Sequence, residues 1–188
     1  MKERILVTGG TGYIGSHTVV ELQNSGYDVV IVDNLSNSSA DVVDNIEKVS
    51  GIRPAFEKLD CLDLEGMDKL FTKYPGIKGI IHFAASKAVG ESVQKPLLYY
   101  RNNLVSLINL LELMPKHGVE GIIFSSSCTV YGQPDVLPVT EEAPIKKAES
   151  PYGNTKQINE EIIRDTVASG SPINAIMSVS YTHLRAHE

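Results

Sequence analysis

Three side chains of this sequence have the types and the spacing of a proton-transfer site. Tyr152 and Lys156 are four residues apart, so on a helix both project from the same face. A free tyrosine titrates near pH 10, which is too high for an effective base at neutral pH, but a nearby ammonium group lowers that pKa. Tyr152 could then act as a general base on a sugar or alcohol hydroxyl. Because exposed Tyr/Lys pairs are frequent, the pair alone predicts little, and Ser127, whose hydroxyl can bind the same substrate oxygen, favours catalysis.

A glycine-rich turn near the N-terminus could bind a phosphate. The apolar run Ile5–Val7 predicts a short buried strand, and Gly9, Gly12 and Gly15 follow it at intervals of three. A strand that leads through such a turn into a helix directs backbone amides and the positive end of the helix dipole at an anion. Since tight strand–helix connections are often rich in glycine, the spacing needs support from its surroundings.

The second predicted strand supplies that support. It covers residues 28–32 and ends at Asp33, about 20 positions after the glycines, where a carboxylate can bind both hydroxyls of an adenosine ribose. A negative charge there repels a 2′-phosphate, so the sequence predicts NAD as the cofactor in preference to NADP. The positive nicotinamide ring of NAD⁺ would also help to lower the pKa of Tyr152.

Composition excludes several classes of protein. The 188 residues, 42% hydrophobic and 21% charged, are typical of one soluble globular domain. A net charge of −6 without a basic block argues against a nucleic-acid partner. Neither a membrane-spanning stretch nor a signal peptide is recognisable, which predicts a cytoplasmic protein. Cys61 and Cys128 form no CxxC pair and are expected to be free thiols, and the spacing of the five histidines predicts no metal site.

The order of apolar runs predicts the elements that position these residues. Helices are expected over residues 13–24, with Ile14, Val19 and Leu22 in the core, and over 40–49, 64–73 and from Pro96 until Pro115 and Gly118 end the helix. A last helix is expected to begin at Ser150-Pro151. The long helix from Pro96 is expected to bury Leu97, Leu104, Val105, Ile108 and Leu111.

Strands are expected over 54–59, 79–83 and 121–124, besides the two already named. Strands that alternate with helices and are continuously apolar predict an α/β fold, a doubly wound parallel sheet (Rossmann fold) covered on both faces. The strand ends would then gather on one rim, where ligands of such sheets bind.

The order of these motifs resembles the extended branch of the short-chain dehydrogenase/reductase superfamily, and within it the UDP-glucose 4-epimerase family. The resemblance extends to about Ala175 and rests on the glycine turn, Ser127 and Tyr-x-x-x-Lys, together with four longer segments. These are Thr8–His17, Asp33–Ser38, Ala88–Val93 and Ser125–Gly132.

The resemblance assigns roles position by position. It implies that the amides of Tyr13 and Ile14 meet the pyrophosphate of NAD and that Lys156 holds the nicotinamide ribose. The reacting sugar of the substrate would be bound by Lys87, Ser127 and Tyr152. The remaining cofactor-binding positions that it implies are Asp33, Asn34, Leu35, Ser36, Asn37 and Ser38 around the adenosine, Asp60 and Cys61 beside the adenine, and Phe83, Ala84, Ala85, Lys87 and Asn102 along the cofactor. Cys61 departs from the family, which more often has an aliphatic residue there.

The activity implied is NAD-dependent epimerisation at C4 of a UDP-hexose, from UDP-galactose to UDP-glucose, through a 4-keto intermediate. The long helix and the Tyr152 helix resemble the pair that forms the dimer of this family, so a homodimer is expected. A nucleotide-sugar 4,6-dehydratase is disfavoured because Cys128-Thr129-Val130 offers no carboxylate. A non-catalytic NAD-binding module is disfavoured because both Tyr152 and Lys156 are present.

The C-terminal residues break the family pattern. The segment from Met177 to Glu188 is not apolar enough for a central strand. The sequence therefore predicts an NAD-binding domain over residues 1–177, truncated in its sixth strand and missing the C-terminal substrate domain, and a non-native tail over residues 178–188. From this we expect the chain by itself to have little or no activity.

Overall fold

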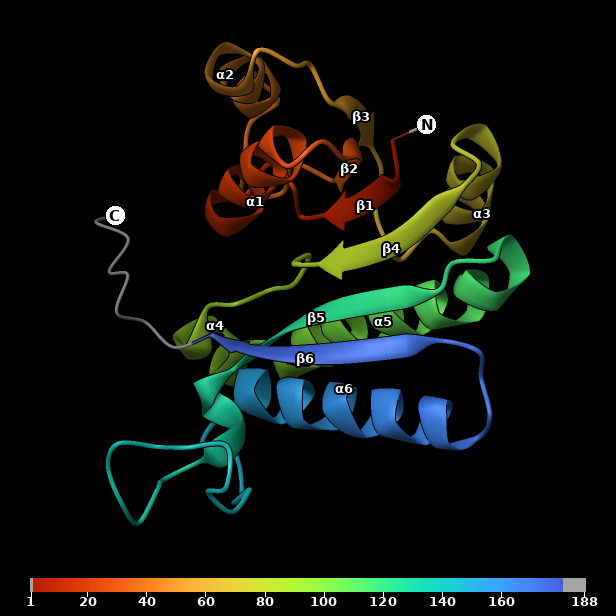
Figure 1. Ribbon diagram of the computed structural model, residues 1–188. Coiled ribbons are helices and arrows are strands. Elements are labelled where there is room, and N and C mark those ends of the chain that lie inside the picture. Colours follow the sequence, from red (N-terminus) through yellow and green to blue (C-terminus); the bar gives the residue numbers. More distant parts are fainter. Residues whose placement is uncertain (1, 181–188) are drawn as a thin grey trace.

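The strands pair into a single parallel sheet with the order β3-β2-β1-β4-β5-β6 (Figure 1). The structure is a computed structural model and describes residues 2–180. Its strands are β1 (Arg4–Thr8), β2 (Asp28–Asp33), β3 (Ala55–Lys58), β4 (Ile77–His82), β5 (Gly121–Ser127) and β6 (Asn174–Ser180). Its helices are α1 (Tyr13–Asn24), α2 (Asp41–Ser50), α3 (Leu64–Lys73), α4 (Val89–Gln94), α5 (Pro96–His117), the 3₁₀ helix η1 (Cys128–Tyr131) and α6 (Pro151–Ala168).

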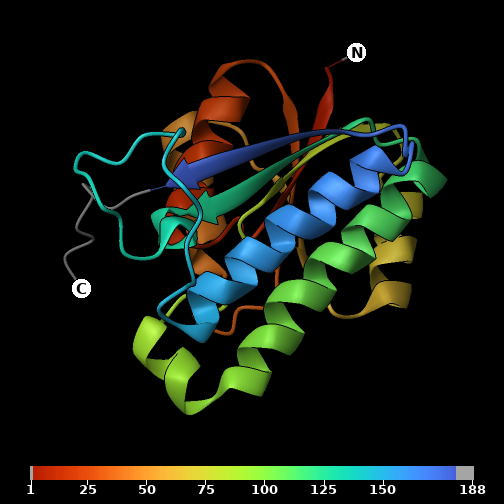
Figure 2. The same ribbon diagram turned by 90° about the horizontal axis from the view of Figure 1, so that it is seen from below.

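Helices cover both faces of the sheet, as the sequence predicts. On one face Val19 of α1 and Ile46 of α2 pack against Val7 and Ile31. On the other face the larger core brings α3, α5 and α6 against the strands, with Ile163 of α6 fully enclosed. Figure 2, seen from below, shows α5 and α6 running side by side over this face of the sheet. The doubly wound Rossmann arrangement is confirmed.

The strand order places the switch of chain direction between β1 and β4. From β1 the chain moves outward to β2 and β3, then returns to the other side of β1 and continues through β4, β5 and β6. Ligands of open parallel sheets bind beyond the carboxyl ends of the strands at this point. The glycine turn follows β1, and the segment after β4 lies next to it, since Phe83 N–H donates to the Thr8 carbonyl at 3.0 Å.

The buried face of α5 differs from the one that its apolar residues predicted. Leu111 is buried as expected, but Leu97 is 82% exposed and Ile108 also faces outward. Asn103 and Ser106 lie in the interior instead, because their polar groups find hydrogen-bond partners there. Pro115 is also accommodated inside the helix, which ends at the left-handed Gly118.

Two further differences concern short segments. Ile14, expected in the core, is 49% exposed, because it lies in the first turn of α1, next to the glycine turn and beyond the strand that the helix covers. The helices α4 and η1 were not predicted, since elements of six and four residues carry too few positions for a helical period to be recognised.

Strand β6 runs to Ser180, three residues beyond the expected domain boundary at residue 177. Its residues pair with β5 along the whole strand, and Ser178 and Val179 lie opposite Ser125 and Ser126. Strand pairing uses backbone groups, so this polar segment continues the ladder without an apolar core. The rest of the predicted tail, residues 181–188, lies outside the described residues.

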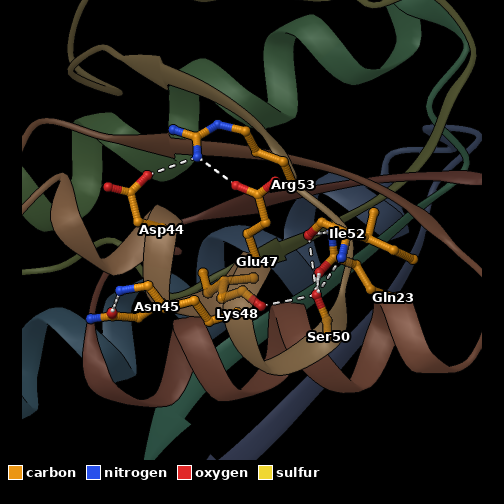
Figure 3. Close-up of polar contacts among 9 residues, drawn as sticks. Gln23, Asp44, Asn45, Glu47, Lys48, Ser50, Ile52 and Arg53 are labelled. Atoms are coloured by element: carbon orange, nitrogen blue, oxygen red, sulfur yellow. Dashed lines mark hydrogen bonds and ion pairs between the residues drawn. The ribbon is translucent and has the colours of Figure 1, made fainter.

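A polar cluster joins the C-terminal ends of α1 and α2 (Figure 3). In the sequence it is distant from Ser127, Tyr152 and Lys156. The buried Gln23 at the end of α1 donates to the Ile52 carbonyl at 3.1 Å and accepts from the Ser50 hydroxyl at 2.8 Å. Beside it, exposed Arg53 pairs with Asp44 and Glu47. Among the described helices, none is long and apolar enough to cross a membrane.

Replacing Gln23 by alanine is expected to lower the free energy of unfolding by about 1–3 kcal/mol, because the side chain is buried and its two hydrogen bonds to Ser50 and Ile52 are lost. Urea unfolding followed by circular dichroism measures this loss. The control is Arg53→Ala, which removes only solvent-exposed ion pairs and should cost clearly less. Equal losses in the two variants would contradict the importance of the buried contacts.

Candidate active site

The glycine turn after β1 is too tightly packed for side chains at two of its positions. Gly9 has φ +70, and a Cβ there would lie 2.7 Å from Ala84 N. A Cβ on Gly15 would lie 2.2 Å from the Gly9 carbonyl oxygen. The first amides of α1 have no partner within the helix, and Tyr13 is exposed in that turn. A strand, a close glycine turn and a helix N-terminus in this order form the geometry in which backbone amides can bind an anion.

Asp33 connects the glycine turn to the loop after β2. Its Oδ2 accepts from the Thr11 amide at 3.2 Å, and its Oδ1 accepts from the Leu35 amide at 2.9 Å and the Ser38 hydroxyl at 3.1 Å. A carboxylate offers about four acceptor positions, so a position remains for a ribose hydroxyl. Leu35 has φ +62, a left-handed conformation that costs a leucine energy and that the bond to Asp33 stabilises.

The same rim extends to β3. Asn34 donates to Asp60 Oδ2 at 3.0 Å, and Asp60 Oδ1 accepts from the Leu62 amide. Cys61 differs from the other predicted cofactor residues because its side chain is buried in the core. Burial, with the charges of Asp60 and Asp33, raises the pKa of its thiol to about 12. Cys61 and the exposed Cys128 are free thiols, as predicted.

An asparagine that the sequence did not single out holds the loop after β4. Asn103 of α5 accepts from the Ser86 amide at 2.8 Å and donates to the Ser86 carbonyl at 3.0 Å. It also reaches Thr155 of α6 at 3.1 Å. The predicted neighbour Asn102 donates to the Ser86 hydroxyl. Only the folded structure identifies Asn103, because its partners are 17 and 52 residues away.

The hydrogen bonds between Asn103 and Ser86 fix the loop after β4, which carries several other predicted residues. Phe83, Ala84 and Ala85 are half-buried next to the glycine turn, and Lys87 is exposed at the far end. In the loop after β2, Ser36 and Asn37 are exposed. The predicted cofactor residues thus lie along one rim at the carboxyl ends of the strands, with Cys61 turned away from it.

The predicted catalytic residues meet at the end of β5. Ser150 caps α6 by accepting from the Gly153 amide, which sets the start of the helix and brings Tyr152 to Ser127. A hydrogen bond with Ser127 lowers the pKa of Tyr152, but burial has the larger effect and raises that pKa above its ordinary value. The Lys156 ammonium donates to the Ser125 carbonyl and lies 5.9 Å from the centre of the Tyr152 ring, so it does not offset the effect of burial on the pKa of Tyr152.

Lys156 lies one turn further along α6 and is almost fully buried. Its Nζ donates to the Ser125 carbonyl at 2.7 Å, and lies 4.7 Å from the centre of the Phe124 ring and 5.9 Å from that of Tyr152. Burial lowers the pKa of Lys156 to about 8, while Glu160 opposes this shift. Lys156 is therefore close to its titration midpoint in mildly alkaline solution.

His82, at the end of β4, is a neutral neighbour of this site. Its ring Nδ1 lies 2.7 Å from the Thr8 hydroxyl. Burial, and secondarily the charge of Lys156, lower its pKa to about 3. In the unfolded chain a histidine titrates near pH 6.5. Between these pH values the unfolded state binds the additional proton, so the contribution of His82 to stability is complete above about pH 6.5 and is lost as the pH falls.

We therefore expect His82 to make the protein sensitive to acid. Its contribution should decrease by up to about 1.4 kcal/mol for each pH unit below pH 6. Urea unfolding at a series of pH values, compared between the wild type and His82→Gln, measures this slope. The exposed His17 provides the control, and a His17→Gln slope that changed as much would contradict the assignment.

The amino-acid sequence is similar to those of known epimerases. The sequence profile of the NAD dependent epimerase/dehydratase family matches residues 5–186. The chain is 47% identical over 185 residues to the UDP-glucose 4-epimerase of Dictyostelium discoideum, and this aligned region covers 98% of this chain and 53% of that protein. It is 53% identical over 161 residues to the UDP-glucose 4-epimerase of Bacillus subtilis, covering 86% of this chain and 47% of that protein.

The fold is also similar to that of a solved UDP-glucose 4-epimerase structure. The UDP-glucose 4-epimerase of Bifidobacterium longum in complex with NAD⁺ and UDP is similar with a TM-score of 0.90 and 45% identity, over 93% of this chain and 52% of that one. The chain thus spans about half the length of the curated relatives that it matches.

Proposed function

The chain belongs to the NAD dependent epimerase/dehydratase family, and from this we propose that the protein interconverts UDP-galactose and UDP-glucose by epimerisation at C4. The observation that carries the proposal is the hydrogen-bonded pair of Ser127 and Tyr152 beside a buried lysine. This group lies on the same rim as the glycine turn and Asp33. The relatives with NAD and with UDP in their structures support the choice of ligands.

The rim residues fit NAD. The amides of Tyr13 and Ile14 at the start of α1 would bind the pyrophosphate, and the remaining acceptor position of Asp33 would bind the adenosine ribose. Residues 34–38, Asp60 and the loop from Phe83 to Lys87 would border the cofactor, while Asn102 would reach it from α5. Lys156 would hold the nicotinamide ribose.

We further propose the chemistry of each side chain at the reacting carbon. Tyr152 takes the proton of the 4-hydroxyl, and Ser127 donates a hydrogen bond to the same oxygen. NAD⁺, when bound, supplies the hydride acceptor and a positive charge near Tyr152. The 4-keto sugar would then rotate in the pocket, the same hydride would return to the opposite face of C4, and Tyr152 would give the proton back to the 4-oxygen. The charge of Lys156 favours the phenolate form of Tyr152.

Because the chain by itself is expected to have little or no activity, the test is incubation with UDP-galactose of the protein at the length of its relatives, about twice that of this chain. Formation of UDP-glucose is the expected result, detected by chromatography of the nucleotide sugars. A 4-keto-6-deoxy product would identify a dehydratase, which the segment Cys128–Val130 disfavours because it carries no carboxylate. NAD binding without any turnover would instead identify a non-catalytic NAD-binding module.

We also propose that the protein forms a homodimer through α5 and α6. Leu97 and Ile108 expose apolar surface on α5, and Val167 does so on α6. Exposed apolar side chains on two helices that pack side by side would be covered in such a dimer, which supports this choice of interface. Sedimentation velocity is expected to give a dimer for the wild type and a monomer for Ile108→Glu, with Val136→Glu, on an exposed loop, as the control. A monomeric wild type would contradict this proposal.

A further inference from the structure

Three consecutive serines at the end of β5 each contact a different turn of α6. Ser127 bonds to Tyr152, the Ser125 carbonyl accepts from Lys156, and the Ser126 hydroxyl donates to Glu160. The three helix residues are four positions apart, so they lie along one face of α6. Two of them belong to the proposed site, and Glu160 extends the row by one turn.

Glu160 is a buried carboxylate with its oxygens held on both sides. It is 5% exposed, its Oε1 accepts from Ser126, and its Oε2 accepts from Arg164 Nη2 at 2.7 Å. Burying a charged carboxylate is unfavourable unless it is paired and hydrogen-bonded. Ser126 is itself buried, so this contact fixes the carboxylate to the strand that carries Ser125 and Ser127.

Lys156 is affected by a neighbouring carboxylate because burial disfavours its charged form. It is 4% exposed. Toward its Nζ lie the Ser125 carbonyl and the Phe124 ring from β5, the Tyr152 ring from α6, and His82 from β4. His82 is neutral because burial lowers its pKa to about 3. Glu160 is the negatively charged group that favours the protonated lysine, and it opposes the effect of burial.

We propose that Glu160 is a positioning residue for Lys156, holding the ammonium in its charged form and in a fixed place against β5 through Ser126. This inference rests on the proposed function, in which the charge of Lys156 favours the phenolate of Tyr152. Glu160 acts through Lys156 and does not reach the substrate itself.

NMR titration of the lysine side chains in the intact protein tests the proposal, with the Lys156 signal assigned by its loss in Lys156→Arg. In Glu160→Gln the titration midpoint of Lys156 should be lower by about one pH unit or more. Glu160→Asp keeps the charge and should restore most of the wild-type midpoint. The matched control is Glu161→Gln, which removes the same charge from an exposed neighbour and should leave the midpoint unchanged.

An unchanged midpoint in Glu160→Gln, or an equal decrease in Glu161→Gln, would overturn the proposal. If Glu160→Gln does not fold, Arg164→Gln decides the question, because Arg164 is 47% exposed and Glu160 keeps its hydrogen bond from Ser126. Removing this competing cation should raise the Lys156 midpoint, and no change would count against the proposal. Calorimetric titration of the wild type with NAD and the UDP-galactose assay test the proposed function separately. A failure of the proposal for Glu160 is therefore distinguishable from a failure of the proposed function.

Discussion

Replacing Tyr152 by phenylalanine is expected to lower the rate of UDP-galactose epimerisation by about 10²–10⁴-fold, the usual contribution of a positioned acid–base group. The phenol is the proposed proton acceptor, and phenylalanine keeps the ring and its packing while removing only the hydroxyl. The affinity for NAD should change little, because the pyrophosphate and adenosine are proposed to bind at Tyr13, Ile14 and Asp33. Turnover assays and calorimetric titration of the same preparation measure the two quantities.

Tyr27→Phe is the matched control for this experiment. Tyr27 packs against the core on the face of the sheet covered by α1 and α2, so the loss of its hydroxyl should leave turnover unaffected. Because burial raises the pKa of Tyr152, wild-type turnover should increase as the pH rises above neutral. A Tyr152→Phe protein that works at the wild-type rate would refute the proposed mechanism.

Replacing Gly15 by alanine should have the second large effect, on the binding of NAD. The added methyl group would lie 2.2 Å from the Gly9 carbonyl oxygen and 2.9 Å from the Gly10 Cα, and both are backbone atoms that move only with the whole turn. Overpacking of this kind costs about 1–3 kcal/mol. Since the turn is the proposed pyrophosphate site, its displacement should weaken NAD binding by up to about 100-fold.

Calorimetric titration with NAD and urea unfolding measure these two effects. Gly90→Ala is the control, because Gly90 is also in a helix and a Cβ there would meet no atom within 4 Å. It should bind NAD as the wild type does and be as stable or slightly more stable. Wild-type affinity in Gly15→Ala would mean that the turn tolerates a side chain and is not the pyrophosphate site.

Much of the fold could be predicted because its signals are local. Helix α1 spans Tyr13–Asn24, as the glycines on either side of it and its apolar spacing indicate, and α3 spans Leu64–Lys73, followed by the turn residues Pro75-Gly76. Ser150-Pro151 correctly locates the start of α6. The alternation of apolar strands with helices also determines the parallel sheet, since a parallel strand must be reached by a crossover.

The prediction was wrong for the buried face of α5 because burial there depends on partners that are distant in the sequence. Leu97 and Ile108 look like core residues in a helical period, yet Asn103 and Asn109 occupy the interior. Asn103 bonds to Ser86 and Thr155, and Asn109 bonds to the carbonyl of Cys61. A hydropathy pattern does not reveal that a polar residue will find such partners.

For the site, the sequence determined which residues are present at the strand ends and on one face of the last helix: the glycine turn, Asp33, Ser127, Tyr152 and Lys156. The tertiary structure decided their electrostatics. It raised the pKa of Tyr152, lowered that of Lys156 and set Glu160 beside the lysine. The physical reason is that residue type and spacing define which groups can ionise, whereas solvent exclusion and neighbouring charge, which set their pKa values, arise only when distant segments pack together.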